Sequence, residues 1–142
     1  MRWLKERKMG TSQFQFSNPM LSELQFYIND AYGVDVEEIN VNLGININKK
    51  RISDTEAIVE LTVEIGDKSD NAPFYITATE GAVFRWEEDA FDKEQDIEKL
   101  LNVNAPALLL SYLRPVVSNI TMFSKYPAYN IPFINFNNAR NS

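Results

Sequence analysis

The sequence predicts an α+β fold in which several long antiparallel strands are followed by one long helix. The first supporting observation is the stretch Val36–Asn48, where apolar residues alternate with asparagine or glycine from Ile39 onward. A period of two indicates a strand with one buried and one wet face, which favours antiparallel pairing. The second is the helical spacing of apolar residues after Asn104. Strands that precede a helix in this way are typical of α+β domains.

Strands are expected along most of the first 86 residues. The clearest segments after Val36–Asn48 are Glu56–Ile65 and Phe74–Trp86. Leu21–Asn29 also fits a strand, with Leu24, Phe26 and Ile28 on one face. A short strand is expected to begin at Phe14 and Phe16, and Asn18-Pro19 ends it. Turns are predicted at Lys49–Asp54 and Gly66–Pro73. Gly81 interrupts its strand pattern and predicts a bulge or a bend there.

The helix after Asn104 has almost no charge. Asn104 is the predicted N-cap and Pro106 lies in the first turn. One apolar stripe is expected along the helix; it consists of Leu109, Leu113, Val116, Ile120 and Phe123, widened by Leu108, Tyr112 and Met122. A thin polar seam runs opposite and is the predicted oligomer interface; its members are Ser111, Arg114, Ser118 and Thr121. The alternative is a central helix of a monomer, but a chain of this length rarely surrounds a helix completely.

Composition narrows the function. The chain has no cysteine and no histidine, so thiol nucleophiles, zinc–thiolate sites and the commonest general base are missing. A net charge of −6 argues against a nucleic-acid partner. No uninterrupted apolar run reaches the ~20 residues of a membrane span, so no membrane insertion is expected. A cytoplasmic protein that is not an enzyme and uses no cofactor or metal is therefore predicted.

The acidic stretch Glu87–Glu98 is the main candidate for acid–base or calcium chemistry. Its spacing does not fit a calcium-binding loop, and a solvated connector is the simpler interpretation. A short helix is expected over Lys93–Leu101. An enzyme that uses Asp, Glu, Tyr or Lys is the least favoured alternative, because no nucleophile–base pair or phosphate loop is visible.

Three segments divide the chain. Residues 1–13 are polar and basic, and are expected to be a flexible terminus or, alternatively, an anchor for acidic lipids. A single domain is expected over 14–136, and a polar tail over 137–142. Within the domain, Lys125–Phe136 is apolar and stiffened by Pro127 and Pro132, so it must cover a core or present an adhesive surface.

The spacing around the helix resembles the SecB family of protein-export chaperones. Pro106 lies early in the helix, and Tyr112 and Arg114 follow at the family's spacing. In the family the helix is followed by the motif Phe-Pro-x-x-Asn-x-x-x-x-Asn-Phe. This chain matches the motif, with tyrosine in place of the first phenylalanine, at Tyr126, Pro127, Asn130, Asn135 and Phe136. Gly81 and Phe84 match the end of the preceding strand.

The resemblance implies a four-stranded antiparallel sheet with a crossover, packed against a long helix, in a dimer of dimers. It also implies ATP-independent binding of unfolded or precursor polypeptides in apolar grooves. The residues that the resemblance places in the client groove are Tyr32, Tyr129, Ile131, Phe133 and Phe136. Plain core packing is the alternative for each of these side chains.

Two features depart from the family pattern. Docking on the translocation ATPase SecA uses acidic residues of the outer sheet face, and among Glu23, Tyr27 and Thr77 only the first is acidic. The family's second helix and acidic tail do not follow Phe136. The alternative function is therefore a non-catalytic oligomeric adaptor that kept the fold without an export role.

Overall fold

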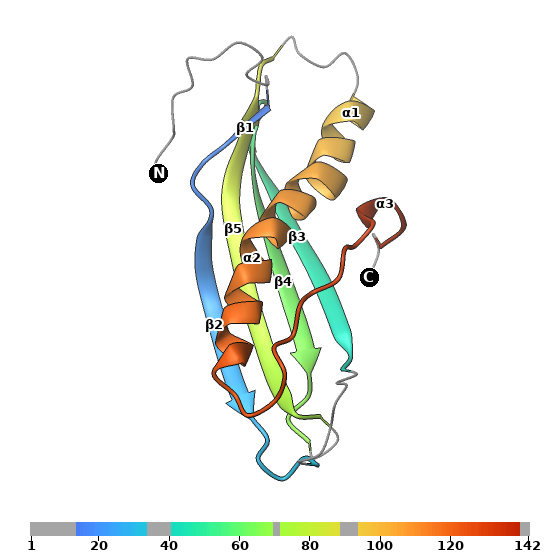
Figure 1. The fold of residues 1–142 in the computed structure, drawn as a ribbon. Helices are drawn as coiled ribbons and strands as arrows, with labels where there is room; N and C mark the ends of the chain where they lie inside the picture. The colour runs from blue at the N-terminus through green and yellow to red at the C-terminus, as the bar shows by residue number, and fades with distance from the viewer. Residues whose placement is uncertain (1–13, 34–40, 70–71, 89–93, 140–142) are drawn as a thin grey trace.

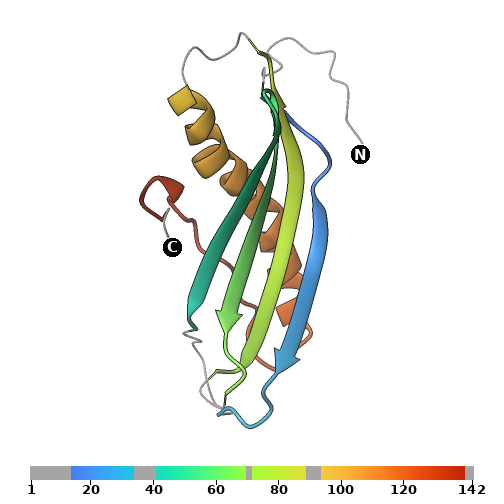
Figure 2. The ribbon, with the colours of Figure 1, turned by 180° about the vertical axis from the view of Figure 1, so that it is seen from behind.

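The protein consists of two layers, an antiparallel sheet and a long helical rod that crosses one of its faces (Figures 1 and 2). The structure is a computed structural model and describes residues 14–33, 41–69, 72–88 and 94–139. The predicted flexible segment 1–13 and residues 140–142 of the predicted tail lie outside the described residues, as does the beginning of the predicted strand at 36.

The sheet has five strands in four rows. Two collinear strands share one edge of β5, and the order across the sheet is β1/β2, β5, β4, β3. The strands are β1 (Phe14–Phe16), β2 (Met20–Ile28), β3 (Leu43–Ser53), β4 (Glu56–Gly66) and β5 (Phe74–Trp86). All pairs are antiparallel. Because β2 lies at one edge and β3 at the other, the chain between them crosses the sheet, which confirms the predicted crossover. The sheet has one strand more than the four predicted, because β1 and β2 both pair with β5.

The strand period separates the two faces of the sheet as predicted. On the inner face, Val59, Leu61 and Val63 of β4 are fully buried. Phe26 of β2 pairs with Ile76 of β5, so the apolar side of β2 also faces inward. The outer face carries polar residues, including Thr62 and Thr79, whose hydroxyl oxygens lie 2.7 Å apart. One wet face and one buried face are what the alternating sequence requires.

The third strand is longer than predicted at its C-terminal end. The turn expected at Lys49–Asp54 is still strand as far as Ser53, and the chain turns at Asp54 and Thr55. Contacts with the first helix explain the difference, because Lys49 Nζ lies 3.0 Å from Glu98 Oε1 and Arg51 pairs with Glu94. Part of the predicted acidic connector is therefore bound to the sheet.

Gly81 does not itself form a bulge. The irregularity lies in the neighbouring strand β2, between Leu21 and Glu23, while Gly81 pairs with Met20. A Cβ atom at position 81 would lie 3.0 Å from Cγ of Glu60. A larger residue at position 81 would therefore require the Glu60 side chain to shift.

The helical rod is continuous from Glu94 to Met122. Helix α1 (Glu94–Lys99) passes through a π-helical turn, η1 (Leu100–Asn104), into α2 (Ala105–Met122). The predicted helix near Lys93–Leu101 is thus confirmed, but the predicted N-cap is wrong, because Asn104 is helical and its side chain makes no capping bond. Pro106 has no N–H to donate to the preceding turn, which accounts for a local change in helix type just before it. A last short helix, α3, spans Phe136–Ala139.

The buried stripe of α2 is rotated relative to the predicted one. Leu109, Leu113, Val117 and Thr121 are fully buried, whereas Phe123 is 84 % exposed. Apolar residues surround most of this helix, so their spacing alone could not fix which side faces the sheet. Thr121 tolerates burial because its hydroxyl donates to the carbonyl of Val117 over 2.8 Å.

One carboxyl group lies on the buried inner face of the sheet. Glu80 is 5 % exposed and is flanked by Leu21 of β2 and Leu61 of β4. Burial raises the pKa of the Glu80 carboxyl above its ordinary value. The folded protein therefore binds this proton more tightly than the unfolded chain, and stability falls as pH rises from the ordinary glutamate pKa through the raised one.

We expect Glu80→Gln to raise the melting temperature at pH 7 by about 2–5 °C. The gain should vanish near pH 4, because native Glu80 is then protonated in both folded and unfolded states. Thermal unfolding followed by circular dichroism at both pH values measures this. An equal gain at both values would contradict a role for the buried charge.

Candidate functional site

The segment that follows α2 returns alongside the helix to α3 and forms the candidate site (Figure 1). Two side chains of α2 hold it. The Thr121 hydroxyl accepts the backbone N–H of Tyr129 over 2.8 Å, and Nε of Arg114 donates to the carbonyl of Ile131 over 2.9 Å. These bonds replace backbone pairing that Pro127 and Pro132 make impossible for a regular strand.

An aromatic cluster joins this segment to the chain just before the crossover. The rings of Tyr32 and Tyr126 meet edge to face with centroids 5.8 Å apart. Tyr129 packs against Phe74 at 6.3 Å. Burial raises the pKa of Tyr129, so this phenol remains protonated across the physiological range.

Polar contacts fasten the same two segments together. The Tyr126 hydroxyl donates to the carbonyl of Asn29 at 2.5 Å, and lies 3.4 Å from the carbonyl of Tyr32. Lys125 adds a hydrogen bond of 2.9 Å to the carbonyl of Asp30. Sequence reasoning missed this latch, because it aligned Tyr126 with a phenylalanine and gave its hydroxyl no role.

The five residues predicted to line a client groove do not form one open surface. Ile131 and Phe136 are 0 % and 2 % exposed and belong to the core. Tyr32 and Tyr129 are partly buried against that core. Phe133 alone projects into solvent, 88 % exposed, with the Arg114 guanidinium 4.5 Å from its ring centroid. Ile131 and Phe136 could meet a client only if the segment moved.

The four predicted interface residues lie in different surroundings. Ser111 is exposed, and its hydroxyl donates to the carbonyl of Leu108. Ser118 is half-buried, and Arg114 binds the returning segment as described above. Thr121 is fully buried within the subunit and therefore does not face a partner in this arrangement.

Several apolar side chains on or next to α2 are exposed. Tyr112 and Met122 of the helix are 40 % and 63 % exposed, Phe123 at its C-terminal end is 84 % exposed, and Phe133 lies against Arg114. Sequence analysis placed the first three within the buried stripe. Exposed apolar groups that cluster on one helix mark an interaction surface more often than scattered ones do.

The predicted docking residues of the outer sheet face are close in register. Glu23 and Tyr27 of β2 are exposed, whereas Thr77 of β5 is 8 % exposed. Thr77 pairs with Glu64 of β4, which accepts a hydrogen bond of 3.0 Å from the Tyr75 hydroxyl. Glu64 is thus the acidic residue of this face that lies next to Thr77.

Within the described residues, no group of three or more acidic side chains is placed to hold a metal ion. The helical stretch Glu94–Met122 is long and apolar enough to cross a membrane by length and composition, although 39 % of its most apolar window is buried in the protein. Core helices of soluble proteins pass the same test, and α2 packs against β4 and β5.

The sequence matches a known protein family over most of its length. The model of a family described as preprotein translocase subunit SecB matches residues 11–139. The chain belongs to the SecB family. This confirms the family resemblance predicted from the helix and from the motif that ends at Asn135 and Phe136.

Individual relatives are distant. An uncharacterised protein of Methanocaldococcus jannaschii is 27 % identical over 124 residues, which cover 85 % of this chain and 78 % of the relative. The protein-export protein SecB of Jannaschia sp. is 28 % identical over 103 residues, covering 70 % of this chain and 58 % of that protein.

Among solved structures, a SecB-like chaperone of Mycobacterium tuberculosis, in complex with a ChAD peptide from the HigA1 antitoxin, superposes with a TM-score of 0.70. It is 11 % identical, and the match covers 85 % of this chain and 90 % of that one. At this identity the likeness shows a shared fold.

The Tyr126 latch is testable. We expect Tyr126→Phe to lower the free energy of unfolding by about 1 kcal/mol, because the carbonyl of Asn29 loses a buried donor. Urea unfolding measures the change. Tyr112→Phe is the matched control, since no hydrogen bond from that hydroxyl is seen within the described part of the chain. A loss of equal size in both variants would contradict a specific latch.

Proposed function

We propose that this chain is an ATP-independent chaperone that binds unfolded or precursor polypeptides on apolar surface beside α2. The observation that carries the proposal is the exposed Phe133, held against Arg114 by the same segment that carries Tyr126 of the aromatic cluster. Family membership supports a chaperone role in protein export. Peptide binding by the mycobacterial SecB-like chaperone supports the substrate class.

The physical basis of such binding is burial of apolar surface without a chemical step. An unfolded client exposes apolar side chains, and each Å² removed from water contributes about 25 cal/mol. Rigid aromatic rings lose little conformational entropy when they contact a client. Arg114 stiffens Phe133 further, since its guanidinium lies 4.5 Å from the ring centroid and is also bound to the carbonyl of Ile131.

Self-association is the second part of the proposal. Exposed Tyr112, Met122 and Phe123 lie on α2 or at its C-terminal end, and α2 carries no carboxylate, so a second copy could cover the helix without burying two carboxylates together. Small residues such as Ser111 would allow close helix approach. A dimer of dimers is the arrangement we propose. Ser118 would lie at the rim of the contact, and Thr121 would support it from inside the subunit.

Delivery of clients to a translocation ATPase is a weaker part of the proposal. Glu23 and Glu64 give the outer sheet face some acidic character near Tyr27 and Thr77. The adaptor alternative is supported by the burial of Ile131 and Phe136, because these two residues of the predicted groove are not accessible to a client. Client binding separates the two functions, because an adaptor without chaperone activity would leave an aggregating protein unprotected.

We expect the native chain, at stoichiometric concentration, to suppress light scattering by a chemically unfolded test protein diluted into buffer. Phe133→Ser should require a several-fold higher concentration for the same suppression, because the exposed ring is lost. Ile52→Ser is the matched control, since Ile52 is a 49 % exposed apolar residue on β3. Full activity of Phe133→Ser, or no suppression by the native chain, would overturn the proposal.

The proposed interface can be tested with an added charge. We expect Ser111→Glu to shift the protein to a species of lower mass in light scattering coupled to gel filtration, since a carboxylate would be buried between helices. Gln95→Glu, which adds the same charge to exposed α1, should leave the mass unchanged. A native chain that is monomeric at all concentrations would contradict the interface.

A further inference from the structure

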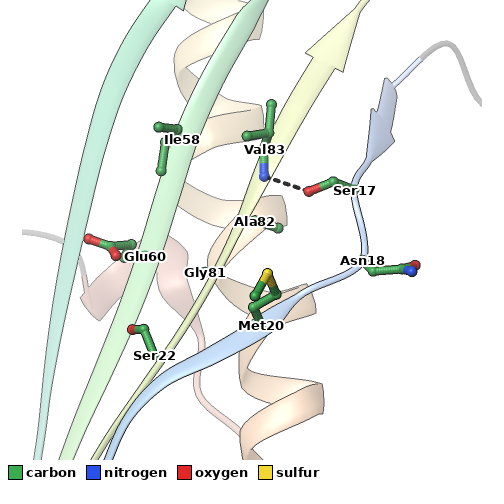
Figure 3. Close-up of a pocket in the computed structure, with 9 residues that line it drawn as sticks. All are labelled: Ser17, Asn18, Met20, Ser22, Ile58, Glu60, Gly81, Ala82 and Val83. Atoms are coloured by element: carbon green, nitrogen blue, oxygen red, sulfur yellow. Dashed lines mark hydrogen bonds between the residues drawn. The ribbon is translucent and has the colours of Figure 1, made fainter. Parts of the chain in front are cut away.

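An apolar pocket lies on the outer face of the sheet, opposite the layer that carries the candidate site. Its volume is about 490 Å³. The walls come from β2, β4, β5 and the link between β1 and β2 (Figure 3). The lining residues that matter most are Met20, Ile58, Val83, Gly81 and Glu60.

Two local features create this pocket. The chain leaves the edge of β5 between β1 and β2, where Asn18-Pro19 interrupts strand pairing. Ser17 spans the break by bonding Val83 twice, since its N–H donates to the Val83 carbonyl and its hydroxyl accepts the Val83 N–H, both over 2.9 Å. Beside the break, Gly81 places no side chain over the floor of the pocket.

The pocket is unusual for a sheet face that is otherwise wet. Met20 is 71 % exposed and Ile58 is 37 % exposed, so apolar side chains remain in contact with water there. Glu60 gives the pocket an acidic side. Glu23 is the next outward-facing residue of β2 that pairs with β5 after Met20. Two basic residues also lie on this face, Lys50 opposite Ile58 and Arg85 opposite Glu56. The three carboxylates of Glu23, Glu56 and Glu60 outnumber them. An occupant with a large apolar group flanked by positive charge would match this chemistry.

We propose that residues 1–13 of the same chain occupy this pocket, with Trp3 and Leu4 inserted between Met20 and Ile58. This segment holds four of the chain's 14 basic residues and one of its 20 acidic ones. Arg2 and Lys5 directly flank the apolar pair Trp3-Leu4. The segment therefore has both a large apolar group and flanking positive charge, although the net charge of the whole chain is −6.

The length of the segment permits the contact. Phe14 pairs with Trp86, which lies five positions from Gly81 along β5, or about 17 Å at about 3.3 Å per residue. Six residues such as 4–9 span about 20 Å when extended, so the segment is long enough to cover this distance. The inner face at this end is already occupied, since Phe84 and Trp86 are 0 % and 5 % exposed.

A second copy of the chain fits the pocket less well. Its outer sheet face would present the same acidic residues, Glu23 and Glu60, and like charges would oppose close approach. An anionic lipid surface would attract the basic residues of segment 1–13. The carboxylates beside the pocket would repel the same surface. Charge thus favours the basic segment of the same chain as the occupant.

Tryptophan fluorescence tests the proposal directly. The chain has two tryptophans, and Trp86 is 5 % exposed. Acrylamide quenching of the native chain and of Trp3→Phe therefore yields the accessibility of Trp3 by difference. The free peptide of residues 1–13, which contains Trp3 alone, provides the reference for a fully accessible ring. We expect Trp3 in the native chain to be quenched several-fold less than in the peptide, at all protein concentrations.

A pocket variant identifies the binding place. Ile58→Lys puts a positive charge and a polar end into the pocket and should restore quenching of Trp3 toward the value of the peptide. Tyr27→Lys, at a residue 50 % exposed on the same sheet face but outside the pocket lining, should have no effect. Circular dichroism confirms that both variants are folded.

Several outcomes would overturn the proposal. One is quenching of Trp3 in the native chain as strong as in the free peptide. Another is protection that survives Ile58→Lys or that grows with protein concentration, since both place Trp3 elsewhere. Protection that arises only when phosphatidylglycerol vesicles are added would instead assign residues 1–13 to a lipid surface.

Discussion

The contact between α2 and the inner face of the sheet is the constraint on which the rest of the structure depends. Leu109, Leu113 and Val117 of the helix are fully buried, as are Leu61 and Val63 of β4. Ile131 and Tyr126 of the returning segment join the same core from the side. Burial of apolar area is the main favourable term in folding, so this one contact fixes both the side of the sheet that is wet and the side of α2 that remains exposed.

The returning segment after α2 depends on that contact. Because Thr121 is held against the sheet, its hydroxyl has a fixed position from which it accepts the N–H of Tyr129. Arg114, about two helical turns before Thr121, binds the carbonyl of Ile131 and contacts the exposed ring of Phe133. Tyr126 then connects the segment to the start of the crossover. The candidate site is therefore a consequence of how α2 sits, rather than of a separate structural unit.

Sequence periodicity predicted the strands well and the helix face poorly. Strand β5 was predicted from Phe74 to Trp86 and is observed there, because a period of two over a long segment leaves only one choice of buried face. Around α2, apolar residues occupy nearly every side, so their spacing supported several rotations of the helix. Thr121 was assigned to the polar surface although its hydroxyl is satisfied within the helix. The predicted cap at Asn104 failed for a related reason, since the chain before it is already helical.

By itself, the sequence determined the α+β class, the wet outer face of the sheet and the family, because these follow from alternation, from composition and from the spacing of Pro106, Tyr112 and Arg114. Only the tertiary structure decided which apolar residues are core and which are surface: Ile131 is buried and Phe133, two positions later, is exposed. The two residues lie in a segment without regular secondary structure, so no repeating period links position to environment. Their exposure is set by bonds to Arg114 and by the shape of α2, and such contacts between distant parts of a chain leave no local pattern in the sequence.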